Sequence, residues 1–151
     1  MIDRAARDSL AEHLRQLASG TISNFAFEER PKNTSGDPSI HAIGYGLAWP
    51  NYDDFKEHRL DGGFKLTDGQ KKDFARAVMF LKTDLEFRWP KQSFSRSLRN
   101  YFGRVFSYGA WMPEPDGGDR AVWPFWTKDE YELALENPPY LAGKPETDLH
   151  R

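Results

Sequence analysis

Apolar residues recur at helical spacing through much of the chain, most clearly in its middle. There the intervals of three or four residues place one set of side chains on a single helical face: Phe74, Val78, Leu81 and Leu85. Thr67 and Gln70 fit a capping box, which begins a helix near Asp68. Pro90 keeps Trp89 out of the helical region of backbone space. The pattern therefore predicts a long central helix from Asp68 to the Trp89-Pro90 pair.

Shorter helical patterns precede the central helix. Residues 4–19 carry apolar positions at helical spacing, Asp3 is a suitable N-cap, and Gly20 suits the position just past the helix end. Asp37 followed by Pro38 predicts the start of a second helix, which continues to Trp49-Pro50. Residues 53–60 form a third, short helix in this interpretation, with Tyr52 and Phe55 pointing inward.

Two further helices are predicted after the central helix, over residues 93–108 and 128–136. Thr127 and Glu130 fit a capping box at the start of the second one. Residues 110–126 are rich in proline and glycine and predict a loop, with 122–126 as a short extended piece docked on the core. No stretch alternates like a long strand. The predicted fold is mainly α: a compact single domain over residues 1–142, of five or six helices with long loops and room for one short β-hairpin. Residues 143–151 are expected to be a loose C-terminal tail.

The composition excludes several kinds of site and segment but does not indicate a function. The 151 residues are 38% hydrophobic and 29% charged, with a net charge of −2 and no cysteine. A disulfide framework and a thiolate metal site are therefore excluded. The N-terminal segment is charged throughout, unlike a secretory signal, and no apolar run approaches the roughly 18 residues of a membrane span. We expect a cytoplasmic protein without a membrane partner.

Two Asp-x-x-x-His spacings are the candidate metal ligands: Asp37 with His41, and Asp54 with His58. Residues four apart share a helical face, so two packed helices would bring two carboxylates and two imidazoles to one ion. The competing interpretation is a surface acid near a surface histidine at each position. Asp84 and Glu86 are a second pair of carboxylates, but residues two apart do not face each other on a helix.

Charge is unevenly distributed along the second half of the chain. Residues 88–104 hold five cations and no acid, whereas residues 112–136 hold seven acids and two cations. Arg96, Arg99 and Arg104 are the candidate nucleic-acid contacts, beside aromatic residues that could stack on bases. Neutralisation of one segment by the other, within the fold or between subunits of a homo-oligomer, is the simpler interpretation, and it makes nucleic acid the third choice.

The candidate partner-binding site consists of aromatic and acidic residues in the predicted loop over residues 110–126. We assign to it three tryptophans and three neighbouring acids: Trp111, Glu114, Asp116, Asp119, Trp123 and Trp126. Aromatic side chains on loops are typical anchors of protein interfaces. The alternative is that the Trp-Pro pairs at 49, 89 and 123 stop elements and seal the edge of the core.

Three stretches together resemble uncharacterised small bacterial proteins: FLKTDLEFRWP at 80–90, VWPF at 122–125, and 131–140 with its Pro-Pro pair. The resemblance extends to the N-terminal helix that ends at Gly20, and it implies a bacterial, single-domain protein, with no ligand or catalytic residue attached. The sequence contains no phosphate loop and no Gly-x-Ser-x-Gly elbow. We therefore expect a non-enzymatic protein-binding module without a cofactor, immunity- or antitoxin-like, whose partner is another bacterial protein. The alternative is a small metal-dependent enzyme that uses the two Asp/His pairs.

Overall fold

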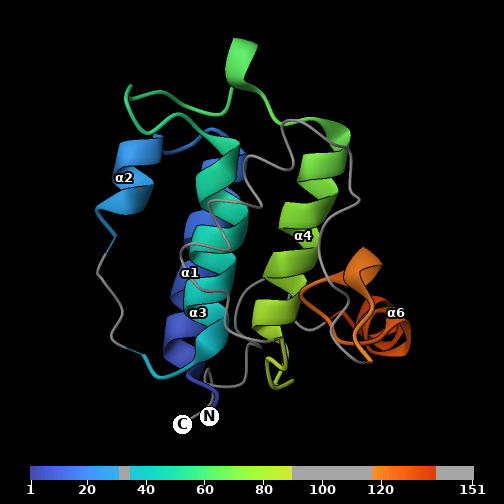
Figure 1. Cartoon of the computed structure of the whole chain (residues 1–151). Coiled ribbons are helices and arrows are strands. Elements are labelled where there is room, and N and C mark those ends of the chain that lie inside the picture. Colours follow the sequence, from blue (N-terminus) through green and yellow to red (C-terminus); the bar gives the residue numbers. More distant parts are fainter. Residues whose placement is uncertain (31–34, 90–116, 139–151) are drawn as a thin grey trace, which may run out of the picture.

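A computed structural model describes residues 1–30, 35–89 and 117–138 of the chain. It is mainly helical, as the sequence predicts (Figure 1). The α-helices are α1 (Arg4–Ala18), α2 (Asn24–Glu28), α3 (Pro38–Ile43), α4 (Asp68–Lys82) and α6 (Lys128–Glu136). Single turns of π- or 3₁₀-helix are η1 (Gly44–Ala48), η2 (Trp49–Asn51), η3 (Gly62–Phe64) and η4 (Arg120–Val122). Within the described ranges the β pairing is one isolated bridge, between Ser23 and Arg59.

The core lies between α1 and α4, which pack on each other more extensively than any other two described elements. Helix α3 lies beside them, and α6 lies near the end of α4 (Figure 1). Both long helices bury one face, as their spacing predicts. The buried side chains include Leu10, Leu14 and Leu17 from α1 and Phe74, Val78 and Leu81 from α4.

Local capping signals act as predicted at three helix ends. The Asp3 carboxylate accepts a hydrogen bond from Ala6 N at 3.0 Å and begins α1. Gly20 ends that helix with φ of 71°, a conformation that favours glycine because it has no Cβ. Thr67 and Gln70 form the complete capping box of α4. These signals act within a few residues, so the sequence alone predicts them.

Helix α4 ends at Lys82, seven residues before the predicted end at Trp89. Thr83 takes an extended conformation, with ψ of 162°, and its hydroxyl donates to Phe80 O at 2.7 Å. Residues 84–89 then run without helical structure. Two arginines of α1 also bind backbone carbonyls in the last turn of the helix and just after it, so residues far away in the sequence help to set where the helix ends.

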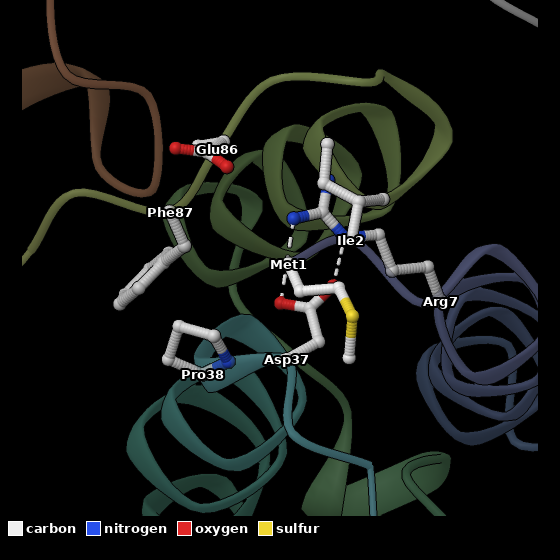
Figure 2. A pocket seen from close by; sticks show the side chains of 7 residues that line it. All are labelled: Met1, Ile2, Arg7, Asp37, Pro38, Glu86 and Phe87. Carbon is white, nitrogen blue, oxygen red and sulfur yellow. Dashed lines mark hydrogen bonds and ion pairs between the residues drawn. The ribbon is translucent and has the colours of Figure 1, made fainter.

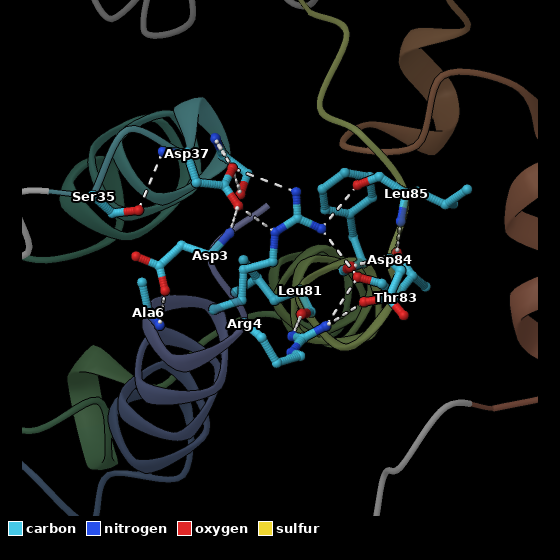
Figure 3. A network of polar contacts seen from close by, with 12 residues as sticks. Asp3, Arg4, Ala6, Ser35, Asp37, Leu81, Thr83, Asp84 and Leu85 are labelled. Atoms are coloured by element: carbon cyan, nitrogen blue, oxygen red, sulfur yellow. Dashed lines mark hydrogen bonds and ion pairs between the residues drawn. The ribbon is translucent and has the colours of Figure 1, made fainter. Parts of the chain in front are cut away.

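Arg7 and Asp37 form a buried ion pair at that point, with side chains only 1% exposed (Figure 3). Arg7 Nε donates to the Asp37 carboxylate at 2.6 Å. Arg7 Nη1 donates to Thr83 O at 3.0 Å and to Leu85 O at 2.8 Å. Arg4 adds bonds to Leu81 O and Thr83 O. The cations meet the negative end of the α4 dipole, which favours this helix end over a longer helix.

Asp37 is also the N-cap of α3, so its carboxylate both pairs with Arg7 and begins that helix. It accepts hydrogen bonds from Ser39 N at 3.0 Å and Ser39 Oγ at 2.7 Å, and from Asp3 N at 3.1 Å. Burial raises the pKa of the Asp37 carboxyl, but the bonds from Arg7, Ser39 and Asp3 more than offset this. The pKa therefore lies below its ordinary value.

The predicted helix over residues 53–60 is absent, and this prediction was wrong. Residues 53–58 form turns, and Phe55 points into solvent instead of inward. The predicted helix over 93–108 and the predicted tail over 143–151 lie outside the described residues.

None of the helices in the described ranges combines the length and the apolar content that crossing a bilayer requires.

Replacing Arg7 with alanine should lower the free energy of unfolding by about 3–5 kcal/mol, because it leaves Asp37 buried without its cation. Arg15→Ala, on the exposed side of the same helix, is the matched control and should change it by less than about 1 kcal/mol. Urea denaturation measures both. Equal losses in the two variants would contradict the role given to the buried pair.

The stabilising effect of the Asp37 charge should also depend on pH. A carboxyl whose pKa falls on folding stabilises the protein above its unfolded pKa, and that contribution is lost as pH falls through the folded value. The unfolding free energies of wild type and Asp37→Asn should therefore converge below about pH 4, as measured by urea titration at several pH values. Other carboxyls titrate in both proteins and cancel. A difference that stays constant to the lowest pH tolerated would refute this.

Candidate functional site

The four candidate metal ligands are not brought together. Asp37 turns into the core and its carboxylate is occupied by Arg7 and Ser39. His41 is exposed and its ring lies against Tyr45, with centroids 4.7 Å apart. Asp54 and His58 lie on the turns of residues 53–58, where residues four apart share no helical face. Among the described residues, no three acids or histidines are placed to hold a metal ion.

A small pocket lies over the Arg7–Asp37 pair (Figure 2). Its volume is about 50 Å³, far below the roughly 300–1,000 Å³ of sites for small organic ligands. Pro38 and Phe87 form part of its wall, and Glu86 stands at its edge. The charged pair in its floor is already fully hydrogen-bonded, so the pocket has room for a few waters and offers no free catalytic group.

The segment 117–127 packs onto the core, and its tryptophans take part in that packing. Phe125 is completely buried and meets the Phe80 ring edge-on, with centroids 5.3 Å apart. Trp123 is half-buried against the core, and its carbonyl accepts a bond from Arg76 Nε at 2.6 Å. Asp119 is the N-cap of η4, with its carboxylate 2.9 Å from Ala121 N.

Trp126 is partly buried and contacts residues that lie before and after the segment 90–116 in the sequence. Its ring contacts Trp89 edge-on at 5.3 Å between centroids. A Cβ added at Gly118 would lie 3.0 Å from the Trp126 ring, so this close approach depends on glycine. The Trp89 indole N–H in turn donates to Pro124 O at 3.0 Å. Trp123 and Trp126 are thus both partly buried and both engaged in contacts within the fold, and their role in partner binding stays a prediction.

Arg88 and Glu130 form an ion pair between the predicted basic and acidic segments. Glu130 also accepts a bond from Trp126 N at 3.0 Å, one residue earlier than the predicted capping box requires. Arg88 lies over the Trp126 ring at 5.5 Å. The other candidates of these segments lie outside the described residues, and their roles stay predictions: Arg96, Arg99, Arg104, Trp111, Glu114 and Asp116.

Residues 52–58, the Phe55 loop, are held by one buried side chain. Asn24, completely buried in α2, donates through its side-chain amide to Asp53 O at 2.6 Å and to Lys56 O at 3.0 Å. Its side-chain oxygen accepts from His58 N at 2.8 Å. Its backbone N–H donates to His58 O at 3.0 Å. Four hydrogen bonds from a single residue thus fix the path of the loop.

The loop presents Phe55 to solvent. This side chain is 97% exposed, and the Asp53 carboxylate holds its backbone N–H at 2.8 Å. Phe64 in η3, 48% exposed, stacks on His58 with ring centroids 4.1 Å apart. The loop and η3 lie at the end of the molecule away from the N-terminus (Figure 1).

Sequence reasoning missed this site. Helical spacing from Tyr52 suggested an inward Phe55, although a charged residue precedes and follows it, Asp54 and Lys56. Asn24 carried no signal, because its partners lie about 30 residues away.

Comparison of the chain with protein-family models, with curated proteins and with solved structures gives no match. The resemblance to small bacterial proteins therefore stays a prediction.

Asn24→Ala should lower the free energy of unfolding by about 2 kcal/mol and release the loop, because several backbone groups lose their partner. Hydrogen exchange of the His58 amide should become at least about 10-fold faster. Asn137→Ala, at an exposed helix end, should change neither quantity. Unchanged exchange at His58 would show that the loop does not depend on Asn24.

Proposed function

We propose that this chain is a non-enzymatic protein-binding module that docks through the Phe55 loop. The observation that supports it is the combination of a fully exposed phenylalanine and a backbone held by the buried Asn24. The concrete form we favour is an immunity- or antitoxin-like protein that binds another bacterial protein. The resemblance noted above supports the bacterial setting.

The energetics favour Phe55 as an anchor. Transfer of a phenylalanine side chain from water to an apolar pocket contributes about 1.5–3 kcal/mol. Single exposed apolar residues are common on protein surfaces, so exposure alone carries little weight. Phe55 differs from such residues because its loop is already ordered, so little conformational entropy of the backbone remains to be lost on binding.

The proposed anchor differs from the tryptophan segment that the sequence suggested. Trp123 packs against the core and Trp126 packs on Trp89, so a partner that engaged either ring would have to displace these contacts. Phe55 makes no such contact and is available as it stands.

The test is a tagged pull-down from the native cells, followed by affinity measurement with the purified partner. Phe55→Ala should weaken that affinity by about 30-fold or more, as expected of an interface hot spot. Leu133→Ala, at a 62% exposed position of α6, is the matched control and should bind as wild type does.

Both variants alter exposed side chains, so thermal unfolding should confirm an unchanged fold. A proteome without a stoichiometric partner, or equal binding by Phe55→Ala and wild type, would refute the proposal.

A further inference from the structure

The arginine that follows α2 turns its charged group onto an aromatic ring of the core. Arg30 is partly buried, unlike the exposed Arg15 of α1. Its guanidinium lies 4.0 Å from the centroid of the Phe27 ring, and its Nη1 donates to Phe27 O at 2.9 Å. A cation over an aromatic face is attracted by the negative charge density of the ring. Arg30 is therefore held to α2 by two contacts with one residue.

A glycine of a second element leaves room for this guanidinium. Gly44 is buried at the start of η1, and a Cβ added there would lie 2.8 Å from Arg30 Nη2. A side chain at Gly44 would thus displace the guanidinium from the place that it occupies. The arginine consequently fills a space between α2 and η1.

The Phe27 ring connects Arg30 with the start of the Phe55 loop. Phe27 is 1% exposed and meets Tyr52 edge-on, with ring centroids 6.3 Å apart. Tyr52 is the first residue of the loop, is partly buried and packs against the core. Asn24 bonds only backbone groups later in the loop. The rings therefore restrain the start of the loop, and Asn24 restrains the rest.

We infer that Arg30 is a positioning residue for the proposed anchor, Phe55. It acts through the rings of Phe27 and Tyr52, and it does not itself contact the partner. The inference rests on the proposed function and adds a residue that prepares the same site for binding. By restraining the start of the loop, Arg30 reduces the conformational freedom that the loop would lose on binding.

The first measurement is hydrogen exchange in the chain without a partner. Arg30→Met keeps an unbranched side chain and removes the guanidinium. Exchange of the Phe55 amide should become about 5-fold faster, whereas exchange of the His58 amide, which Asn24 holds, should change by less than about 2-fold. A general loss of stability would accelerate both amides alike. Arg15→Met, the same substitution at an exposed position, is the control and should alter neither.

The second measurement is the affinity for the partner captured above. Arg30→Met should weaken binding by about 5-fold, because the loop is less ordered before it binds. The same substitution in the Phe55→Ala background should weaken binding no further, since two residues that act through one contact are not additive. Gly44→Ala, which displaces the guanidinium without removing it, should weaken binding in the same way.

The two measurements separate this inference from the proposed function. Equal acceleration of the Phe55 and His58 amides, or no acceleration, would overturn the positioning role whether or not a partner is found. Equal losses from Arg30→Met in the wild-type and Phe55→Ala backgrounds would also overturn it, since they indicate that Arg30 contacts the partner directly. Faster exchange at Phe55 alone, with equal binding by Phe55→Ala and wild type, would overturn the proposed function and leave Arg30 only as a support of the loop.

Discussion

The buried pair of Arg7 and Asp37 is the interaction on which the rest of the structure depends. It joins the start of α1, the N-cap of α3 and the chain that leaves α4. A buried charge is costly unless it is paired and its remaining hydrogen-bonding atoms are satisfied. Here both conditions hold, because Arg7 donates to carbonyls 76 and 78 residues away and Asp37 accepts from Ser39 and Asp3. The pair therefore specifies how three elements meet as well as contributing to stability.

A similar arrangement is found at the opposite end of the molecule, where an uncharged buried side chain binds backbone groups. Arg7 donates hydrogen bonds to backbone carbonyls that follow α4, and Asn24 forms hydrogen bonds with backbone groups of the Phe55 loop. In both places a buried polar side chain satisfies backbone that has no helix or sheet to bond with. At α4 the result is a helix end, and at the loop it is an ordered display of Phe55. The proposed binding surface and the end of α4 are thus both held by a buried polar side chain that binds backbone groups.

The distribution of aromatic side chains separates structure from candidate function. Phe80, Phe125 and Tyr131 pack on one another around the end of α4, and Trp89 and Trp126 close the edge beside them. A ring that packs on its neighbours in this way would have to give up some of these contacts to anchor a partner. Phe55 is the opposite case, because its apolar side chain is 97% exposed. The contrast is why we place the docking surface on the loop and not on the tryptophans.

The sequence by itself determined the mainly helical class, the starts of α1, α3, α4 and α6, and the end of α1 at Gly20. Those features follow from caps and spacings whose partners lie three or four residues apart, so the order of residues is enough to predict them. Only the tertiary structure decided that α4 ends at Lys82, that Asp37 is buried, and that Phe55 faces solvent. Each of these results from hydrogen bonds across about 30 to 80 residues, from Arg7, Arg4 and Asn24. Periodicity carries no information about such distant partners, and so the candidate site emerged only from the folded chain.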